Sequence, residues 1–323
     1  MNARLAFFAV AAAALLVSWC SSFVLWRAAE RGDEVVTLDA RDMGALSVVA
    51  VGTGSAWENP TRGGPSIAVG AGEDVWLVDA GRGVAEGLRR ARIPVAQPSV
   101  VYLTSLLPEN TVGIDDLLMT GFRQGRAQPL ALVGPPGTEA LARAVEAANA
   151  RGARALAEAL ALAPEGARIE ATEVGPATPF DAERDGVRIR AGAIPGGPLE
   201  ALAWSFEKRA QRVVVSGVGF GEDALVAFAE GASLLVHEAV YVPTAEDAKN
   251  AEVELDIASL DRERALHTSI NDVGALAARA RVRALALVRL RPPPLYAFRF
   301  AAIAGRTFDG EVEIPEDGDD LWP

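Results

Sequence analysis

The sequence predicts an α/β fold in which mixed sheets and helices form layers, with a hydrophobic helix ahead of them. Three observations lead to this prediction. Hydrophobic residues make up 50% of the 323-residue chain, which is enough to bury a sizeable core. Short apolar runs alternate with segments of helical periodicity, as in layered α/β proteins. The amino end contains a long run without charge.

The uncharged run covers Leu5–Trp26. Its 22 residues are enough to cross about 30 Å of hydrocarbon at roughly 1.5 Å per residue. We therefore expect an uncleaved membrane anchor over residues 1–27. A cleaved signal peptide is the first alternative, disfavoured because Arg27 stands where small residues should precede the cut. A lipoprotein attached at Cys20 is the second, disfavoured by the bulky Trp19.

Residues 28–44 are expected to form a charged linker, and residues 45–323 a single domain. Arg4 flanks the anchor on its amino side, whereas neighbouring acids dilute the charges of Arg27 and Arg31 on the other side. This weak asymmetry places the amino end in the cytoplasm. We expect a single-pass protein of the cytoplasmic membrane whose body is periplasmic or otherwise extracytoplasmic.

Within the domain, the first strand is expected at Leu46–Val51 and is followed by the glycine-rich turn Gly52–Ser55. A helix is expected to begin at Asp79–Gly83, and Thr138–Leu162 predicts one or two surface helices. The acidic tail, residues 311–323, is expected on the surface. The other expected strands are short and apolar: Ser66–Val69, Asp74–Val78, Val100–Leu103, Leu130–Val133, Val187–Ala191, Leu202–Phe206, Arg212–Ser216, Leu234–Val236 and Ala284–Val288.

Charge and composition disfavour several classes of function. The 31 basic and 43 acidic residues give a net charge of -12, which repels phosphate backbones, so no nucleic-acid partner is expected. A single cysteine, Cys20, cannot form an internal disulfide. The chain has only two histidines, His237 and His267, whereas a catalytic zinc site usually takes three protein ligands rich in histidine.

Six segments, in the right order, carry a family resemblance. Together they resemble the ribonuclease Z-like and arylsulfatase-like branch of the metallo-β-lactamase fold, over about residues 46–320. The resemblance implies a four-layer αβ/βα sandwich, a hydrolase ancestry and, from the nuclease-type relatives, a homodimer. The segments are Gly52–Ser55 with Arg62–Ser66, Leu77–Gly83, Gly134–Gly137, Val214–Gly217, Leu235–Ala239 and His267–Ser269.

The family's zinc motif, Thr-His-x-His-x-Asp-His, falls at residues 104–110 of this chain. Ser105, Leu107 and Asn110 stand at the three histidine positions, and Glu109 stands at the aspartate position. Leucine cannot bind a metal, and serine and asparagine are weak zinc ligands beside imidazole.

The resemblance places three further ligand positions on changed residues. Gly196 and Arg289 stand at histidine positions, and Val218 stands at the bridging aspartate. The family's two zinc ions are therefore not expected here, and we predict no cofactor.

Glu238 and His267 stand where family members have a glutamate and a histidine that are thought to assist proton transfer. The resemblance gives them this role by position. The neighbouring His237 is a candidate for ligand binding, together with Asp79 and Arg289. The alternative is structural: His267 caps a helix and Glu238 satisfies it as a buried pair. Arg289 likewise has two interpretations. It binds an anionic ligand in place of metal charge, or it fills the emptied pocket by pairing with Glu109 or Asp79.

We expect a pseudohydrolase with a binding role, at the membrane and beside a homodimer partner or an active paralogue. The alternative is an active hydrolase of esters, lactones or phosphodiesters that uses Glu109, Glu238, His267 and Asp79. A ribonuclease Z-like nuclease is a third hypothesis, disfavoured by the net charge, the anchor and the changed ligand positions.

Overall fold

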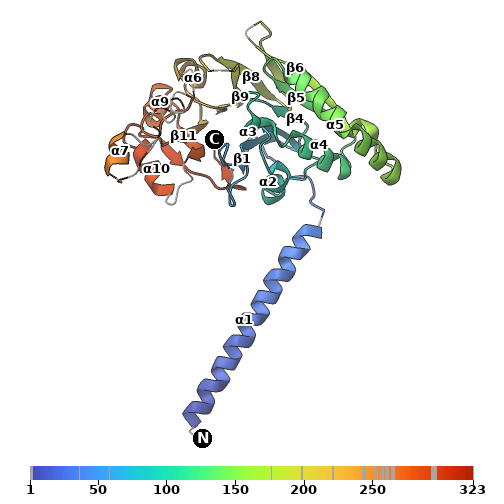
Figure 1. Ribbon diagram of the computed structural model, residues 1–323, viewed down its shortest axis with the longest axis vertical. Helices are drawn as coiled ribbons and strands as arrows, with labels where there is room; N and C mark the ends of the chain where they lie inside the picture. Colours follow the sequence, from blue (N-terminus) through green and yellow to red (C-terminus); the bar gives the residue numbers. More distant parts are fainter. Residues whose placement is uncertain are drawn as a thin grey trace. The chain divides into compact units, whose positions relative to one another are not determined.

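The chain folds into two compact units in the computed structural model, Met1–Asp39 and Ala40–Pro323 (Figure 1). The described residues are 3–35, 37–57, 59–175, 177–197, 199–219, 222–241, 245–250, 266–291 and 297–322, with isolated positions between 251 and 265.

The first unit contains the helix α1 (Ala3–Val35). Alanine, leucine and other good helix formers dominate it, and no proline interrupts it. The helix continues through residues 28–35, which the sequence assigns to a linker, because this stretch also consists largely of helix formers. Among the helices of the described residues, none combines the length and the apolarity needed to cross a membrane, so the expected transmembrane helix is not found.

A seven-stranded mixed sheet forms the first half of the body, in the order β14-β1-β2-β3-β4-β5-β6. Its strands β1 to β3 are antiparallel neighbours, those from β3 to β6 run parallel, and β14 closes the outer edge of β1. The strands are β1 (Ser47–Gly52), β2 (Ser66–Ala71), β3 (Asp74–Val78), β4 (Val100–Tyr102), β5 (Leu130–Gly134), β6 (Ile169–Glu173) and β14 (Asp320–Leu321).

A second seven-stranded sheet has the order β13-β12-β11-β10-β9-β8-β7. The strands from β7 to β10 form an antiparallel meander, and those from β10 to β13 run parallel. The strands are β7 (Asp181–Arg184), β8 (Val187–Ile194), β9 (Ala201–Lys208), β10 (Gln211–Ser216), β11 (Leu234–Val240), β12 (Ala284–Arg291) and β13 (Glu311–Glu313).

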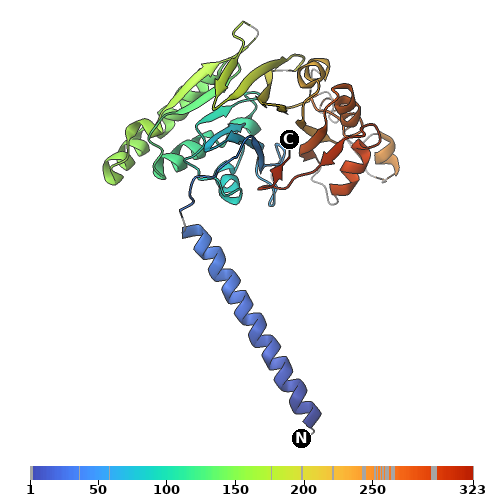
Figure 2. The same ribbon diagram turned by 180° about the vertical axis from the view of Figure 1, so that it is seen from behind.

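Helices cover the outer face of each sheet (Figures 1 and 2). Those beside the first sheet are α2 (Val84–Arg90), α4 (Ile114–Arg123) and α5 (Thr138–Leu160), with the short α3 (Pro108–Thr111) and the 3-10 helix η1 (Pro164–Ala167). Those of the second half are α6 (Glu222–Ala229), α7 (Ala245–Asn250), α9 (Val273–Arg279) and α10 (Ala297–Ala304).

The main core lies between the two sheets. Alternation along β11 shows this arrangement, since Leu234 and Val236 join the inner core while Leu235 joins the core under the outer helices. At the centre the rings of Tyr102 and Trp204 lie 4.6 Å apart. Each fully buried apolar side chain of this kind contributes about 1.5–3 kcal/mol relative to exposure. The layered α/β fold predicted from the sequence is confirmed.

The start of the body differs from the prediction, and its end has structure that the sequence did not indicate. The body begins before residue 45, because Met43 is buried and Arg41 donates a hydrogen bond to the carbonyl of Ala91. The acidic tail lies largely at the surface, as expected, but it is structured. Its residues form β13 and β14, and Asp317 is buried because its carboxylate accepts hydrogen bonds from the backbone N–H groups of Thr53 and Gly63.

Candidate functional site

A small cleft lies at the carboxyl ends of β4, β10, β11 and β12. Its lining includes Glu109 after β4, Val218 after β10, Glu238 on β11, Arg289 on β12, and His267. The carboxyl ends of parallel strands are the usual place for ligand sites in α/β proteins. The room inside the cleft is about 20 Å³, which is about enough for one water molecule and far below the volume of an ordinary small-molecule site, so a ligand can contact this lining only from the open side.

Arg289 reaches this cleft because β12 contains a bulge. Leu287 and Leu290 both pack in the outer core although they are three residues apart, so the alternation of β12 shifts by one residue between them. Arg289 has a φ of 53°, in the left-handed region, and the pairing of β11 with β12 is irregular at the same level. A bulge re-aims a side chain, and this one turns Arg289 toward the first sheet.

Arg289 is held by three residues that follow strands of the first sheet. One of its amino groups donates to Asn110 Oδ1 at 2.7 Å, and the other donates to the carboxylate of Asp79. The backbone N–H of Arg289 donates to the carbonyl of Thr53 at 2.8 Å. The side chains of Arg289 and Asp79 are 7% and 1% exposed, so this ion pair is shielded from water.

Asp79 directly follows β3 and has a φ of 62°. Its two carboxylate oxygens accept hydrogen bonds from the N–H and the hydroxyl of Thr104, each at 2.8 Å. Burial raises the pKa of Asp79, while the charge of Arg289 and the Thr104 hydrogen bonds act against that rise. Because every partner is a donor, the site is built for the ionised carboxylate.

Asn110 ties the segment after β4 to this ion pair. Its Nδ2 donates hydrogen bonds to Ser105 Oγ at 2.8 Å and to Thr104 Oγ1 at 3.1 Å. Its Oδ1 accepts a hydrogen bond from the guanidinium of Arg289. Ser105 and Asn110, which stand at family histidine positions, therefore lie in one hydrogen-bonded network with Arg289. Leu107 is different, because its side chain packs against the outer core of the second sheet.

His267 and Glu238 form a second pair in the cleft. His267 Nδ1 donates to Glu238 Oε2 at 2.9 Å, and Glu238 Oε1 accepts from the N–H groups of Gly219 and Thr268. Burial lowers the pKa of His267, but the hydrogen bond to Glu238 and the charges of Glu238 and Glu109 outweigh it, so the pKa is raised overall. His267 thus holds its proton to a higher pH than a free histidine.

His237 adjoins this pair through Thr268 and is fully buried. The Thr268 hydroxyl donates to the carbonyl of Gly219, so it accepts from His237 Nε2 at 2.8 Å, and the Ser216 hydroxyl donates to His237 Nδ1 at 2.6 Å. Burial lowers the pKa of His237 to about 4. The sequence makes His237 a candidate for ligand binding; in the structure both of its ring nitrogens are hydrogen-bonded to hydroxyl groups and its side chain is fully buried.

Glu109 and Val218 line the cleft, whereas Gly196 lies in an exposed turn between β8 and β9. Trp57 and Arg291 also line it, and sequence reasoning missed both. The guanidinium of Arg291 lies 4.6 Å from the centre of the Trp57 ring, a cation–π contact. No short-range pattern links these two residues, because they come from opposite ends of the body.

Two threonines that position the site were also missed, although a signal for each was present. Thr104 directly precedes Ser105 in the segment that the resemblance aligns with the family's zinc motif, and Thr268 directly follows His267. Each hydroxyl orients a buried group, Asp79 for Thr104 and His237 for Thr268.

The donor set does not suit a pair of zinc ions. Within the described part of the chain, no three histidine, cysteine, aspartate or glutamate residues are grouped so that they could hold a metal ion. Asp79 is buried beside Arg289 and does not line the cleft, and its oxygens already accept hydrogen bonds from Thr104 and Arg289. A guanidinium is permanently cationic and has no acceptor atom, so Arg289 repels a metal cation at this place.

The chain is similar to bacterial proteins named ribonuclease Z. That of Mycobacterium bovis (strain BCG / Pasteur 1173P2) is 30% identical over 280 residues, which are 84% of this chain and 96% of the relative. That of Mycolicibacterium paratuberculosis is 31% identical over 284 residues, 85% of this chain and 96% of the relative. No family model matches the chain.

Two solved structures have a similar architecture. The metallo-beta-lactamase fold protein YhfI from Bacillus subtilis has a TM-score of 0.64 at 18% identity, covering 85% of this chain and 98% of its own. The short form of human tRNase Z has a TM-score of 0.60 at 19% identity, with the same coverage of 85% and 98%. At these identities the likeness shows a shared fold.

Proposed function

Because this chain belongs to the metallo-β-lactamase-fold family that includes ribonuclease Z, we propose that it is a member in which Arg289 has taken the place of the metal centre. Such a protein does not carry out zinc-dependent hydrolysis and acts by binding. The observation that carries the proposal is the buried network of Arg289 with Asp79 and Asn110.

The network can stand in place of a metal centre because each of its charged groups has a partner of opposite charge or a hydrogen bond. Asp79 accepts from Thr104 and Arg289, and Asn110 uses both its amide nitrogen and its oxygen. Leaving one partner of a buried ion pair uncompensated costs about 3–5 kcal/mol. The cleft floor therefore depends on the guanidinium for its stability, as a metal site depends on its ion.

The binding role falls to the open side of the cleft, whose lining has its positive charges on His267, Arg289 and Arg291. A small ligand with a carboxylate or phosphate group matches His267, whose raised pKa favours the protonated ring. Glu109 on the same lining acts against a ligand with several negative charges.

The second candidate is an active hydrolase, and the His267–Glu238 pair favours it. A histidine hydrogen-bonded to a carboxylate at a cleft is a common arrangement for proton transfer. The relatives are named ribonuclease Z, so RNA is the substrate class that this candidate takes, against the expectation of no nucleic-acid partner. The net charge of -12 opposes a long phosphate backbone.

Metal content and turnover distinguish the two candidates. We would purify the full chain in mild detergent without chelator and measure bound zinc by mass spectrometry. Hydrolysis of a precursor tRNA, a phosphodiester, an ester and a lactone would then be compared between wild type and His267→Gln. The binding proposal expects that no stoichiometric zinc is bound. It also expects that any hydrolysis observed is the same in wild type and in His267→Gln. Stoichiometric zinc, or hydrolysis lost in that variant, overturns it.

Attachment to the cytoplasmic membrane through residues 1–27, with an extracytoplasmic body, stays a prediction from the uncharged run Leu5–Trp26. Cell fractionation tests it. An anchored chain sediments with membranes after a carbonate wash and is degraded by protease added outside the cytoplasmic membrane. Recovery of the chain in the soluble fraction contradicts the prediction. A partner, whether a second copy or an active paralogue, would be sought in the fraction that contains the chain.

A further inference from the structure

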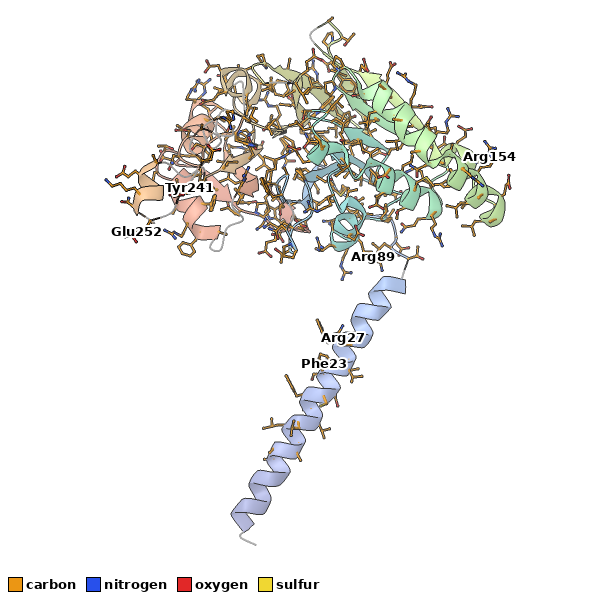
Figure 3. The ribbon with its side chains drawn as sticks, in the orientation of Figure 1. Phe23, Arg27, Arg89, Arg154, Tyr241 and Glu252 are labelled. Atoms are coloured by element: carbon orange, nitrogen blue, oxygen red, sulfur yellow. The ribbon has the colours of Figure 1, made fainter. Side chains whose placement is uncertain are left out.

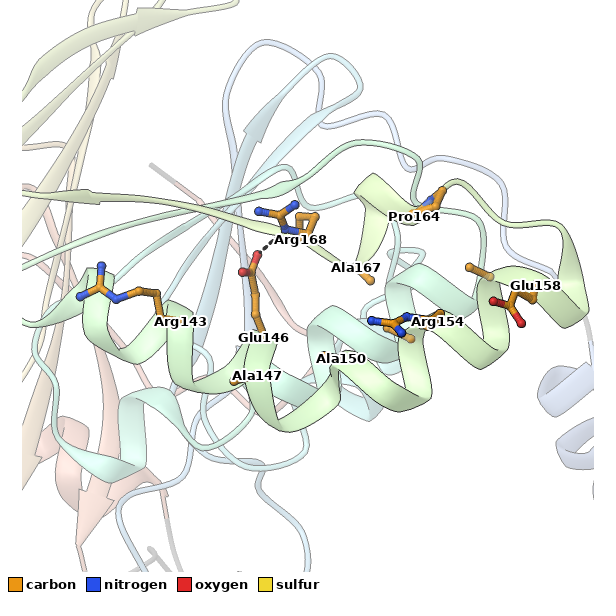
Figure 4. A pocket seen from close by; sticks show the side chains of 11 residues that line it. Arg143, Glu146, Ala147, Ala150, Arg154, Glu158, Pro164, Ala167 and Arg168 are labelled. Atoms are coloured by element: carbon orange, nitrogen blue, oxygen red, sulfur yellow. Dashed lines mark hydrogen bonds and ion pairs between the residues drawn. The ribbon is translucent and has the colours of Figure 1, made fainter.

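The cleft has far less room than a groove beside α5. That groove lies between α5, η1 and the start of β6, contains the ion pair of Glu146 with Arg168, and has a room of about 570 Å³ (Figure 4). The cleft, at about 20 Å³, has room for about one water molecule. The groove and the cleft share no lining residue, so the small size of the cleft has a local cause.

One wall of the cleft is a loop without helix or strand. The loop joins β1 to β2, and its residues Ser55, Ala56 and Trp57 line the cleft. In its described middle part, residues 55–57 and 59–61, hydrogen bonds turn back on the loop, from Thr61 to Asn59 Oδ1 and from the N–H of Trp57 to Ser55 Oγ. The position of this wall therefore depends on how the two ends of the loop are held.

Asp317 holds both ends of this loop with one carboxylate. Its Oδ1 accepts hydrogen bonds from the N–H of Thr53 at 2.9 Å and from the hydroxyl of Thr53 at 2.7 Å. Its Oδ2 accepts from the N–H of Gly63 at 2.6 Å and from the guanidinium of Arg90 at 2.8 Å. Thr53 begins the loop, Gly63 ends it, and the side chain of Asp317 is 1% exposed. Hydrogen bonds to a charged group are stronger than neutral ones, so this carboxylate ties the two ends firmly together.

Arg90 supplies the positive charge beside this carboxylate. It lies in the last turn of α2, next to Arg89 at the surface of the body (Figure 3), and its side chain is 50% exposed. An ion pair with a half-exposed arginine contributes little, because water screens it. The buried hydrogen bonds from Thr53 and Gly63 are therefore the stronger contacts of Asp317.

The tail that contains Asp317 is fastened to the body without this side chain. The N–H of Gly318 donates to the carbonyl of Ala50 at 2.7 Å, and the N–H of Ala50 donates to the carbonyl of Asp319 at 2.9 Å. Beyond them, β14 pairs with β1. These backbone contacts remain when the side chain of Asp317 changes, so its carboxylate serves the loop rather than the tail.

Thr53 and Trp57 connect the loop to the cleft. The carbonyl of Thr53 accepts a hydrogen bond from the N–H of Arg289 at 2.8 Å. Farther along the loop, the ring of Trp57 lies 4.6 Å from the guanidinium of Arg291. Trp57 lines the cleft and is 55% exposed, so its ring stands at the open side. A shift of the loop therefore moves the part of the lining that a ligand meets first.

We propose that Asp317 is a positioning residue for the cleft: it fixes both ends of the loop and so sets Trp57 and Arg291 at the open side, where an anionic ligand approaches. The effect on a ligand rests on the proposed binding function, whereas the hold on the loop stands by itself. A carboxylate near the carboxyl end of the chain thus acts on ligand binding without touching the ligand.

Hydrogen exchange in the full chain, in mild detergent, tests the hold on the loop. Asp317→Asn replaces an acceptor oxygen by an amide group whose own donors face the donors of the loop. Exchange of the backbone N–H groups over residues 53–63 should become roughly tenfold faster, as expected when hydrogen bonds to a charged group are lost. Asp320→Asn is the matched control, because its ion pair with Arg41 fastens the same tail elsewhere. It should leave exchange over residues 53–63 unchanged.

Ligand binding tests the effect on the cleft. Butyrate is the probe, and the NMR signals of the His267 ring report its binding. Asp317→Asn should weaken this binding roughly tenfold, because Arg291 is displaced from the anion. The pKa of His267 should stay as in wild type, since the hydrogen bond to Glu238 on β11 does not involve the loop. General loosening of the body would instead move both the affinity and the pKa, and would do so in Asp320→Asn as well.

The results separate this proposal from the proposed function. Loop exchange in Asp317→Asn that equals wild type overturns the proposal, as do equal effects of Asp317→Asn and Asp320→Asn, or faster exchange with unchanged butyrate affinity. If butyrate does not bind the wild type, the proposed binding function fails, and loop exchange still decides whether Asp317 positions the loop.

A second variant covers the case in which Asp317→Asn does not fold. Thr53→Val removes one of the hydrogen bonds to Asp317 and keeps the backbone N–H that makes another. It should shift loop exchange and butyrate affinity in the same directions, by about threefold. The absence of both shifts in this variant overturns the proposal.

Discussion

Arg289 and Asp79 form a buried ion pair that joins the two sheets at the floor of the cleft. Arg289 belongs to β12 of the second sheet, and Asp79 directly follows β3 of the first. The sequence leaves open whether Arg289 pairs with Glu109 or with Asp79, and the structure shows the pair with Asp79. The network therefore ties the two halves of the body together.

Replacing Arg289 should destabilise the protein strongly. Arg289→Met removes the guanidinium and leaves the carboxylate of Asp79 buried without its charge partner, which should lower the free energy of unfolding by about 3–5 kcal/mol. Chemical denaturation followed by tryptophan fluorescence measures this change. Arg188→Ala is the control, because its ion pair with Asp181 is exposed to water and its loss should change stability little.

A double variant sharpens that prediction. Asp79→Asn in the Arg289→Met background removes the stranded charge, so part of the lost stability should return. If the double variant loses the sum of both single effects, the two side chains do not interact as the structure shows.

His237 should make the protein less stable in acid. Its pKa falls from an ordinary 6.5 to about 4 on folding, so between these values the unfolded chain binds a proton that the folded chain does not. Stability from this group is present above about pH 6.5 and is lost as the pH falls toward 4, by about 3 kcal/mol. The measurement is the difference in unfolding free energy between wild type and His237→Gln across that range. A difference that does not change with pH would contradict the prediction.

His267 should have the opposite dependence on pH. Its pKa is raised on folding, so the folded chain binds the extra proton, and this stability is fully present below the ordinary value of 6.5. It is lost as the pH rises through the folded pKa. NMR titration of the two imidazoles measures both values directly, and Glu238→Gln should lower the pKa of His267. An unchanged His267 titration in that variant would show that the hydrogen bond does not set the pKa.

Gly81 should tolerate no side chain. A Cβ atom at this position would lie 2.5 Å from the carbonyl carbon of Gly64 and 2.7 Å from the backbone oxygen of Glu109, so Gly81→Ala forces apart two loops of the site. We expect a loss of about 1–3 kcal/mol, as for an overpacked core. Gly152→Ala is the matched control, because no atom lies near its Cβ position in α5, and it should stabilise the helix by about 0.5–1 kcal/mol. Equal effects of the two substitutions on the melting temperature would contradict this account.

The sequence predicts most of the fold because local signals and burial agree there. The strand expected at Ala284–Val288 lies within β12, and Thr138–Leu162 contains the single helix α5. The bulge at Arg289 was not predicted, because its left-handed φ depends on bonds to Asp79 and Asn110 from distant segments. Tertiary contacts of this kind leave no trace in local periodicity.

The candidate site could likewise be predicted only in part from the sequence. The resemblance aligned Ser105, Asn110 and Arg289 with family ligand positions, and the structure brings their side chains into one network. Burial of His237 could not be foreseen, because adjacent strand residues point to opposite faces and the sequence does not say which face holds the cleft. The contact of Trp57 with Arg291 depends on the closed sandwich and has no sequence signature.

The pairing of β14 with β1 sets an order of assembly during translation. Strand β1 is made early, but the segment that covers its outer edge comes from the far end of the sequence. Until that segment leaves the ribosome, the nascent sheet presents unpaired backbone groups along a hydrophobic strand, which is a template for aggregation. Production of this protein in cells should therefore depend on chaperones that shield nascent chains.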